Sequence, residues 1–195
     1  MECKNRHYRG MSDLERAEQV YVLISQSFNN TRQSFSKKVY KDTYEYRCDI
    51  QFNIPQVYER LRDVRVLNMD GIELLAKISE NENAFAFVDP PYRKELRGVG
   101  ADKIYTFELP HSEQVRLLKT IRDAKCKIML CGYKAENGKD LYDTYLLSHG
   151  WKSYKLADVE KSCQIKEIRD VGHEYIWVNY ELPELSKYVI SMKQS

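Results

Sequence analysis

The sequence lacks the features that cross-link small domains, such as metal sites, and those that hold proteins in membranes. None of its five cysteines forms a CxxC pair, and no ligand cluster has the spacing of a zinc finger. No window approaches the ~18 consecutive apolar residues of a membrane span, and the first ten residues, MECKNRHYRG, are polar and basic, unlike a signal segment. These absences favour reduced thiols in a cytoplasmic protein that has no metal site and no membrane contact.

What is present is an ordinary globular composition. Of 195 residues, 43% are apolar and 31% are charged, and the net charge is only +2. A chain of this length suffices for one domain that buries roughly 70% of its unfolded surface. The small net charge neither demands nor excludes nucleic acid, so the distribution of the basic residues matters more than their sum.

Hydrophobic periodicity and turn residues predict alternating helices and strands. The expected helices span 12–28, 54–62, 71–80, 112–124 and 139–149. The expected strands span 64–70, 84–88, 127–133, 151–159 and 173–182. Alternation between residues 64 and 150 predicts an α/β sheet with parallel neighbours. The last two strands have no helix between them and are expected to form an antiparallel pair at one edge.

Local signals support this assignment. Ser12 and Glu15 have the spacing of a capping box at the start of the first helix. Gly150 is expected to end the helix that precedes it. Cys126 and Cys131, at the ends of a predicted buried strand, are expected to be small core residues.

The stretch AFAFVDPPYRKE, residues 84–95, places an acid, two prolines and a tyrosine directly after an apolar run. The run has the length and composition of a strand covered on both faces. The prolines end the strand because neither carries a backbone N–H. One interpretation is a strand exit with a polar cap, and the other is a rigid ligand site.

The chemistry of Asp89, Pro90, Pro91 and Tyr92 suits a planar amine. Ionised Asp89 only accepts hydrogen bonds, Pro90 contributes a carbonyl, Pro91 fixes the backbone, and Tyr92 offers a flat ring for stacking. Accepting both amine hydrogens in a rigid site frees the lone pair of the nitrogen, which is stabilisation by preorganised acceptors. The matching electrophile is a methyl group on a sulfonium, placed in line with the nitrogen.

A second carboxylate, Asp70, ends the predicted strand 64–70. Ligands of open parallel sheets bind outside the carboxyl ends of the strands, so Asp70 and Asp89 together suit a ligand rich in N–H donors. An acid directly before a helix is also a common N-cap, and Asp70 precedes the predicted helix 71–80.

Longer stretches around these residues carry a family resemblance. They are FAFVDPPY (85–92), LRDVRVLNMDGIELL (61–75), YTFEL (105–109), LLKTIRDAKCKIMLCGY (117–133), HEYIWVNY (173–180) and SQSFNN (25–30). With them the chain resembles the Dam-type DNA adenine-N6 methyltransferases, most closely their phage-like branch, over nearly all of residues 12–182.

The resemblance implies a Rossmann-like sheet that uses S-adenosylmethionine to methylate N6 of an adenine flipped out of double-stranded DNA, as restriction–modification methylases do. It implies that Asp89 and Pro90 accept the adenine amino group, with Pro91 completing the motif, and that Tyr92 stacks on the base. It also places Asp89 beside the cofactor and Asp70 at the amine of the cofactor's adenine.

The resemblance further implies a DNA-recognition insertion at 29–53 within a single partial methyltransferase domain over 1–195. Basic residues are interleaved there with aromatic ones, either as a solvated hairpin or, in this family's position, as contacts to DNA phosphates. The residues expected to bind DNA are Arg32, Lys37, Lys38, Lys41 and Arg47. Arg93, directly after the motif, is either a further phosphate contact or a loop charge.

One family feature is absent from the sequence. The family begins with a Phe-x-Gly-Gly-type loop that holds the methionine part of the cofactor, whereas here the first glycine is Gly10 and no Gly-rich loop follows an early strand. By resemblance, the first strands of the sheet are missing, which is expected to leave an unpaired apolar edge beside the strand 84–88. We therefore expect either a companion polypeptide that carries the Gly-rich loop or a truncated remnant.

Two other functions fit the sequence less closely. A methyltransferase acting on an RNA base or a glutamine amide usually has Asn at the position of Asp89. A non-catalytic DNA-binding remnant would keep the fold without the cofactor loop.

Overall fold

The structure, a computed structural model, describes residues 10–26, 54–97, 105, 107–136, 138–160 and 171–192. It divides into two units, Met1–Val66 and Leu67–Ser195. The single domain expected over 1–195 stays a prediction. The insertion expected at 29–53 lies outside the described residues, and with it the five basic residues Arg32, Lys37, Lys38, Lys41 and Arg47.

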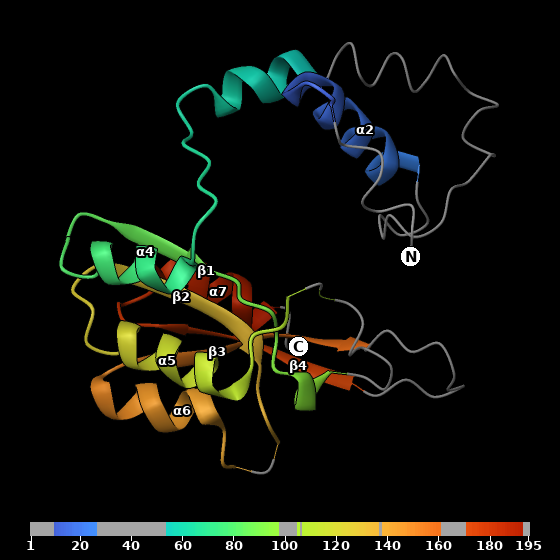
Figure 1. The fold of residues 1–195 in the computed structure, drawn as a ribbon. Coiled ribbons are helices and arrows are strands. Elements are labelled where there is room, and N and C mark those ends of the chain that lie inside the picture. The colour runs from blue at the N-terminus through green and yellow to red at the C-terminus, as the bar shows by residue number, and fades with distance from the viewer. Residues whose placement is uncertain are drawn as a thin grey trace. The chain divides into compact units, whose positions relative to one another are not determined.

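The first unit contains two described helices (Figure 1). The first, α2 (Asp13–Gln26), begins with the predicted capping box. The Ser12 N–H donates to Glu15 Oε2 at 2.7 Å, and the Glu15 N–H donates to Ser12 Oγ at 3.3 Å. The second helix spans 54–61 and has Pro55 in its first turn, where a missing N–H costs nothing.

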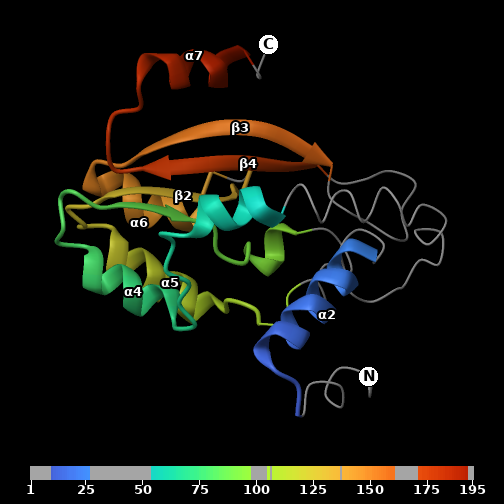
Figure 2. The same cartoon turned by 90° about the horizontal axis from the view of Figure 1, so that it is seen from above.

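The second unit is built on a mixed sheet of four strands (Figures 1 and 2). In the spatial order β1-β2-β4-β3, these are β1 (Phe85–Val88), β2 (Lys127–Tyr133), β4 (Val171–Val178) and β3 (Lys152–Glu160). β1 and β2 are parallel, whereas β4 is antiparallel to both β2 and β3. The α/β class and the antiparallel edge pair are confirmed, but β1 and β2 are the one parallel pair among the described strands.

The strand predicted at 64–70 is not formed. Val64, Val66 and Leu67 are 47%, 88% and 43% exposed instead. An extended segment becomes a strand only by exchanging backbone hydrogen bonds with a neighbour, and no described strand pairs with this one. This sequence prediction is therefore wrong, because an apolar run specifies a surface to bury but not the partner that buries it.

Three helices cover one face of the sheet, which we call the covered face. They are α4 (Gly71–Ile78), α5 (His111–Ile121) and α6 (Leu141–Leu146). α6 runs into the short 3-10 helix η5 (Leu147–His149), which Gly150 ends in the left-handed region at φ +84°, as predicted.

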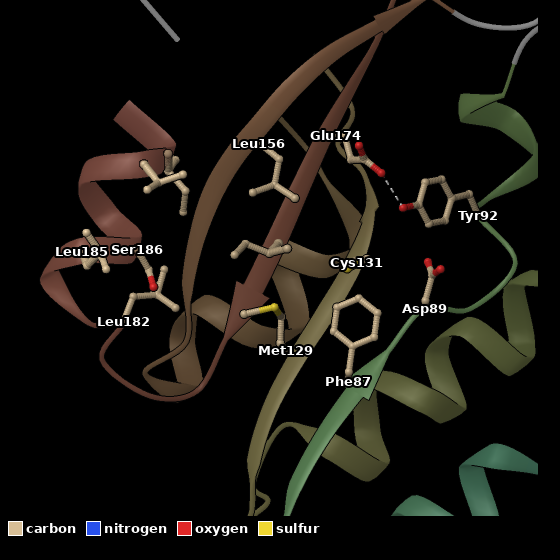
Figure 3. A pocket seen from close by; sticks show the side chains of 13 residues that line it. Phe87, Asp89, Tyr92, Met129, Cys131, Leu156, Glu174, Leu182, Leu185 and Ser186 are labelled. Atoms are coloured by element: carbon tan, nitrogen blue, oxygen red, sulfur yellow. Dashed lines mark hydrogen bonds between the residues drawn. The ribbon is translucent and has the colours of Figure 1, made fainter. Parts of the chain in front are cut away.

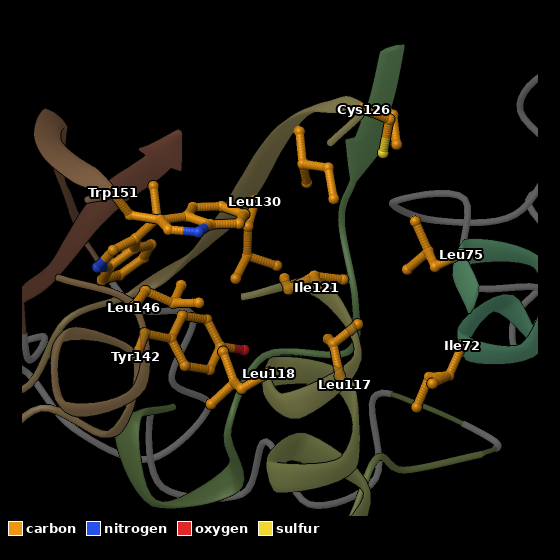
Figure 4. Packing of buried hydrophobic residues seen from close by; sticks show 13 residues of the cluster. Ile72, Leu75, Leu117, Leu118, Ile121, Cys126, Leu130, Tyr142, Leu146 and Trp151 are labelled. Carbon is orange, nitrogen blue, oxygen red and sulfur yellow. The ribbon is translucent and has the colours of Figure 1, made fainter. Parts of the chain in front are cut away.

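The main core lies between these helices and the sheet (Figure 4). Leu117 and Leu118 of α5 meet Ile128 and Leu130 of β2, and Trp177 of β4 is fully buried among them. Cys126 belongs to this core as a small buried residue, as predicted.

The opposite side, which we call the open face, carries the helix α7 (Glu184–Met192). The sequence did not predict this helix. A smaller cluster lies here, formed by Cys131, Ile176, Val178 and Leu182. β1 is poorly covered on this face, since Phe85 and Phe87 are 56% and 62% exposed. The prediction that the strand 84–88 is covered on both faces is therefore wrong.

The outer edge of β1 pairs with no strand among the described residues. Together with its exposed phenylalanines, this is the unpaired apolar edge that the sequence predicts beside the strand 84–88.

Asn179, directly after β4, continues the sheet with its side chain. Its Oδ1 accepts the N–H of Ile128 at 2.7 Å, and its Nδ2 donates to the carbonyls of Cys126 at 2.8 Å and Ala124 at 3.1 Å. The backbone can therefore leave the sheet here and cross to α7 without exposing the start of β2.

Candidate functional site

The motif at the end of β1 opens into a cavity of about 550 Å³ on the open face (Figure 3). Most of its lining is apolar and comes from all four strands and α7, including Phe87, Met129, Leu156 and Leu185. Its acidic groups, Asp89 and Glu174, lie with Tyr92 on the side where β1 ends. A mostly apolar cavity with a few convergent polar groups is the usual form of a ligand site.

Glu174 of β4 holds the ring of Tyr92. The Tyr92 hydroxyl donates to Glu174 Oε1 at 2.8 Å, and the edge of Tyr133 meets the ring, with centroids 4.8 Å apart. Burial, followed by the hydrogen bond to Glu174, raises the pKa of Tyr92 well above its ordinary value. The phenol therefore stays protonated, and the ring has a fixed position beside Asp89.

The backbone of the motif is held from inside the covered face. Gln114 of α5 is 1% exposed, and its Nε2 donates to the Pro91 carbonyl at 3.0 Å. Its Oε1 accepts from the Tyr142 hydroxyl at 2.7 Å. Because both ends of the amide are satisfied, this buried chain of hydrogen bonds fixes the direction of the loop.

Arg93 anchors the other end of the motif. It forms a buried ion pair with Asp140, and its Nη2 also donates to the Tyr133 carbonyl at 2.8 Å. The guanidinium lies over the Tyr142 ring, 4.8 Å from the centroid. With its side chain 5% exposed, Arg93 is not available to a DNA phosphate in this structure. Neither sequence interpretation, a phosphate contact or a loop charge, anticipated this pair.

Asp70 acts as the N-cap of α4. Its carboxylate accepts the N–H groups of Ile72 at 2.7 Å and Glu73 at 3.2 Å, and Arg116 Nη1 donates to its Oδ2 at 3.1 Å. The hydrogen bond from Glu73, with the help of Arg116, holds the pKa of Asp70 below its ordinary value. The capping interpretation is confirmed. Asp70 does not line the cavity of Asp89, and its role toward a cofactor stays a prediction.

Cys131 lines the cavity between the two acids. Burial, together with the charges of Asp89 and Glu174, raises the pKa of its thiol to about 11. A thiol that stays protonated is a poor nucleophile. Cys131 is thus a small buried residue, as the sequence predicts.

Sequence reasoning missed Asp140, Gln114 and Glu174, which hold the motif. Gln114 had a readable signal, because it shares the apolar face of its helix with Leu117, Leu118 and Ile121 at spacings of three, four and seven. A polar residue on such a face needs a buried partner. Glu174 had no readable signal in the sequence, because it reaches Tyr92 only through the pairing of β4 with β2.

No protein-family model and no curated protein matches the chain. Across the described ranges, no group of three or more His, Cys, Asp or Glu side chains could hold a metal ion. Within the same residues, no helix has the length and apolar character needed to cross a membrane.

Proposed function

We propose that the chain takes part in site-specific methylation of adenine N6 in double-stranded DNA, as one part of a split or truncated S-adenosylmethionine-dependent enzyme. The observation that carries the proposal is the rigid exit of β1, where Asp89 and Pro90 precede a loop held by Gln114 and Arg93. Acceptors fixed before the base arrives lose no energy in reorienting during the reaction.

In this proposal, the Asp89 carboxylate and the Pro90 carbonyl accept the two hydrogens of the adenine N6 amine. This favours a tetrahedral nitrogen, whose lone pair is no longer delocalised into the ring. When bound, S-adenosylmethionine would supply a methyl group to this lone pair, and the electron pair of the broken C–S bond would stay on sulfur. Asp89 then takes part in removing a proton from the cationic nitrogen, while Tyr92 packs on the face of the flipped base.

The side chain of Asp70 fits the proposed cofactor contact. It accepts three hydrogen bonds, from Ile72, Glu73 and Arg116, whereas an ionised carboxylate offers about four acceptor sites. With 41% of the side chain exposed, one site is left for an amine such as that of the cofactor's adenine.

The fold supports a sheet that is completed elsewhere. Among the described residues, no strand pairs with the outer edge of β1 or with the segment 64–70. Both observations, together with the lack of a Gly-rich loop in the sequence, fit a partial Rossmann-like sheet without its first strands. In this proposal, a companion polypeptide supplies those strands and the loop for the methionine part of the cofactor.

Methylation by the full chain, co-expressed with the polypeptide of the adjacent upstream reading frame, tests the proposal. Nucleosides from treated DNA would be analysed by mass spectrometry for N6-methyladenine. We expect Asp89→Ala to lower the rate by about 10²–10³-fold, the effect of removing one preorganised charge-stabilising group. Asp63→Ala, whose side chain is 91% exposed, serves as the matched control and should leave the rate unchanged.

Two results would contradict the proposal. One is methylation that persists in Asp89→Ala, and the other is a methyl group found on a base other than adenine. Sequence-specific DNA binding without any methylation would instead favour the non-catalytic module, which the lack of a Gly-rich loop also fits.

A further inference from the structure

The two faces of the sheet are covered to different extents. Neighbouring strands lie about 4.8 Å apart and a helix is about 10 Å wide, so one helix covers about two strands. On the open face, α7 contacts β3. This leaves β1 and β2 without a helix of the described chain above them, and Phe87 is 62% exposed there.

The uncovered area has the shape of a trough. One wall is α7, whose Leu185 and Val189 line the cavity although they are 74% and 46% exposed. Met129 of β2 and Ile176 of β4 line it, and Phe87 lies at the β1 side (Figure 3). Packed helices lie about 8–10 Å apart, so a helix over β1 and β2 would lie directly beside α7.

The charges of the trough select the direction of such a helix. Asp89 and Glu174 lie where β1 ends, and the cavity lining contributed by the described residues contains no basic side chain. The N-terminus of a helix carries a partial positive charge, and anionic groups stabilise it there. A helix with its N-terminus at this end therefore complements the trough, whereas the reverse direction places like charges together.

The exposed aromatic surface of β1 could supply a substantial part of a protein–protein interface. An aromatic side chain buries about 150–250 Å², so Phe85 and Phe87, at 56% and 62% exposure, together offer about 200 Å². That is about a quarter of the ~800 Å² that each partner buries in a standard interface. The outer backbone edge of β1, which no described strand pairs with, adds hydrogen-bonding groups that a strand can use.

We propose that the apolar part of the trough, over β1 and β2, seats an amphipathic helix of the companion polypeptide, beside α7 and with its N-terminus toward Asp89 and Glu174, while the end of the cavity at Asp89 and Tyr92 is left to the base. A strand of the same companion pairs with the open edge of β1. This inference rests on the proposed function, since that function requires the companion. It adds the location of the interface, the orientation of the helix and the role of α7 as a wall.

The test uses the full chain and the polypeptide of the adjacent upstream reading frame. Sedimentation gives the stoichiometry and the dissociation constant, and hydrogen exchange reports the amides of β1 and α7. We expect a 1:1 complex. In it, the exchange rate of the β1 amides should be at least about tenfold lower than in the chain alone, as for amides in a newly paired strand.

Two phenylalanines provide a matched pair of variants. Phe87→Asp places a charge in the trough and should raise the dissociation constant about tenfold or more, the cost of losing an interface anchor. Phe107→Asp makes the same change at a residue that is 85% exposed and lies outside the cavity, and it should leave binding unchanged. Leu185→Asp on α7 tests the other wall and should weaken binding even if Phe87→Asp does not fold.

Several outcomes would overturn the inference. They are the absence of a complex, a complex insensitive to both Phe87→Asp and Leu185→Asp, and a homodimer that protects β1 instead. Methylation distinguishes this failure from failure of the proposed function. A complex with the expected protection but no methylated adenine leaves the interface standing and removes the function. Methylation by the chain alone removes the companion from both proposals and leaves only the adenine chemistry at Asp89.

Discussion

The covered and the open face of the sheet differ in how completely they are built. On the covered face, three helices bury a continuous core, and its polar groups are matched, as in the chain from Tyr142 through Gln114 to the Pro91 carbonyl. On the open face, one helix leaves β1 exposed and a cavity beside the acids Asp89 and Glu174. The covered face thus holds the motif in place, and the side chains of Asp89 and Tyr92 are reached from the cavity on the open face.

Polar interactions should show the largest difference between the faces. Asp140→Ala on the covered face strands the buried Arg93 charge and removes the N-cap of α6, at a cost of about 3–5 kcal/mol. Glu174→Ala on the open face removes one hydrogen bond from Tyr92, at a cost of about 1 kcal/mol. Urea unfolding of both variants measures this contrast, and equal costs would contradict it.

Apolar truncations should give the next largest contrast. Leu130 is 0% exposed in the main core, so Leu130→Ala should cost about 2–5 kcal/mol. Phe87 is 62% exposed, so Phe87→Ala should change the free energy of unfolding by only about 0.5 kcal/mol. A large loss for Phe87→Ala in denaturant titrations would mean that the open face is packed in solution.

The labelling rates of the two buried cysteines measure the solvent access of each face separately. Cys126 lies in the main core, and Cys131 lines the cavity. In a variant with serine at positions 3, 48 and 163, a thiol reagent should label Cys131 faster than Cys126, although burial raises both pKa values. Mass spectrometry of labelled peptides gives the two rates. Slow labelling of Cys131, at the rate of Cys126, would show a closed cavity.

The smallest effect should come from pH at the β3–β4 ladder. His173 Nδ1 lies 2.5 Å from Asp158 Oδ1, Glu136 lies at its Nε2, and Lys155 Nζ donates to Asp158. The two carboxylates, Asp158 first, raise the pKa of His173. The protonated form is thus favoured in the folded state, and its contribution is fully present below the unfolded pKa of about 6.5.

This stability should fall, by at most about 1 kcal/mol, as the pH rises through the raised folded pKa of His173. His173→Gln should flatten that part of the profile of stability against pH. At the acid end, the lowered pKa of Asp158 means that its contribution persists until the pH falls through that lowered value. An unchanged profile in His173→Gln would show that the interaction is absent in solution.

Sequence patterns predicted the bounds of the helices and strands in the second unit better than they predicted which elements pack against one another. The run KIMLCGY predicted β2 with its exact bounds, Lys127–Tyr133, because an apolar run between turn signals is a local property. The segment 64–70 looked equally apolar and formed no strand. The prediction that Phe85 and Phe87 are buried failed for the same reason. Whether a strand face is covered depends on which other element packs on it.

The candidate site shows the same division. Asp89, Pro90, Pro91 and Tyr92 are adjacent in the sequence, so their proximity could be read directly. The ion pair of Arg93 with Asp140 joins residues 47 positions apart, and the hydrogen bond of Tyr92 with Glu174 joins residues 82 apart. Such contacts follow from strand order and register, which a single sequence does not reveal.

The side-chain amide of Asn179 has a consequence for the last helix. Because it seals the start of β2 in place of further backbone, residues beyond 179 are not needed to complete the ladder. α7 therefore packs on the open face as an added helix and takes no part in the pairing of the strands. A helix that docks beside α7 thus meets a sheet whose strand pairing does not depend on α7.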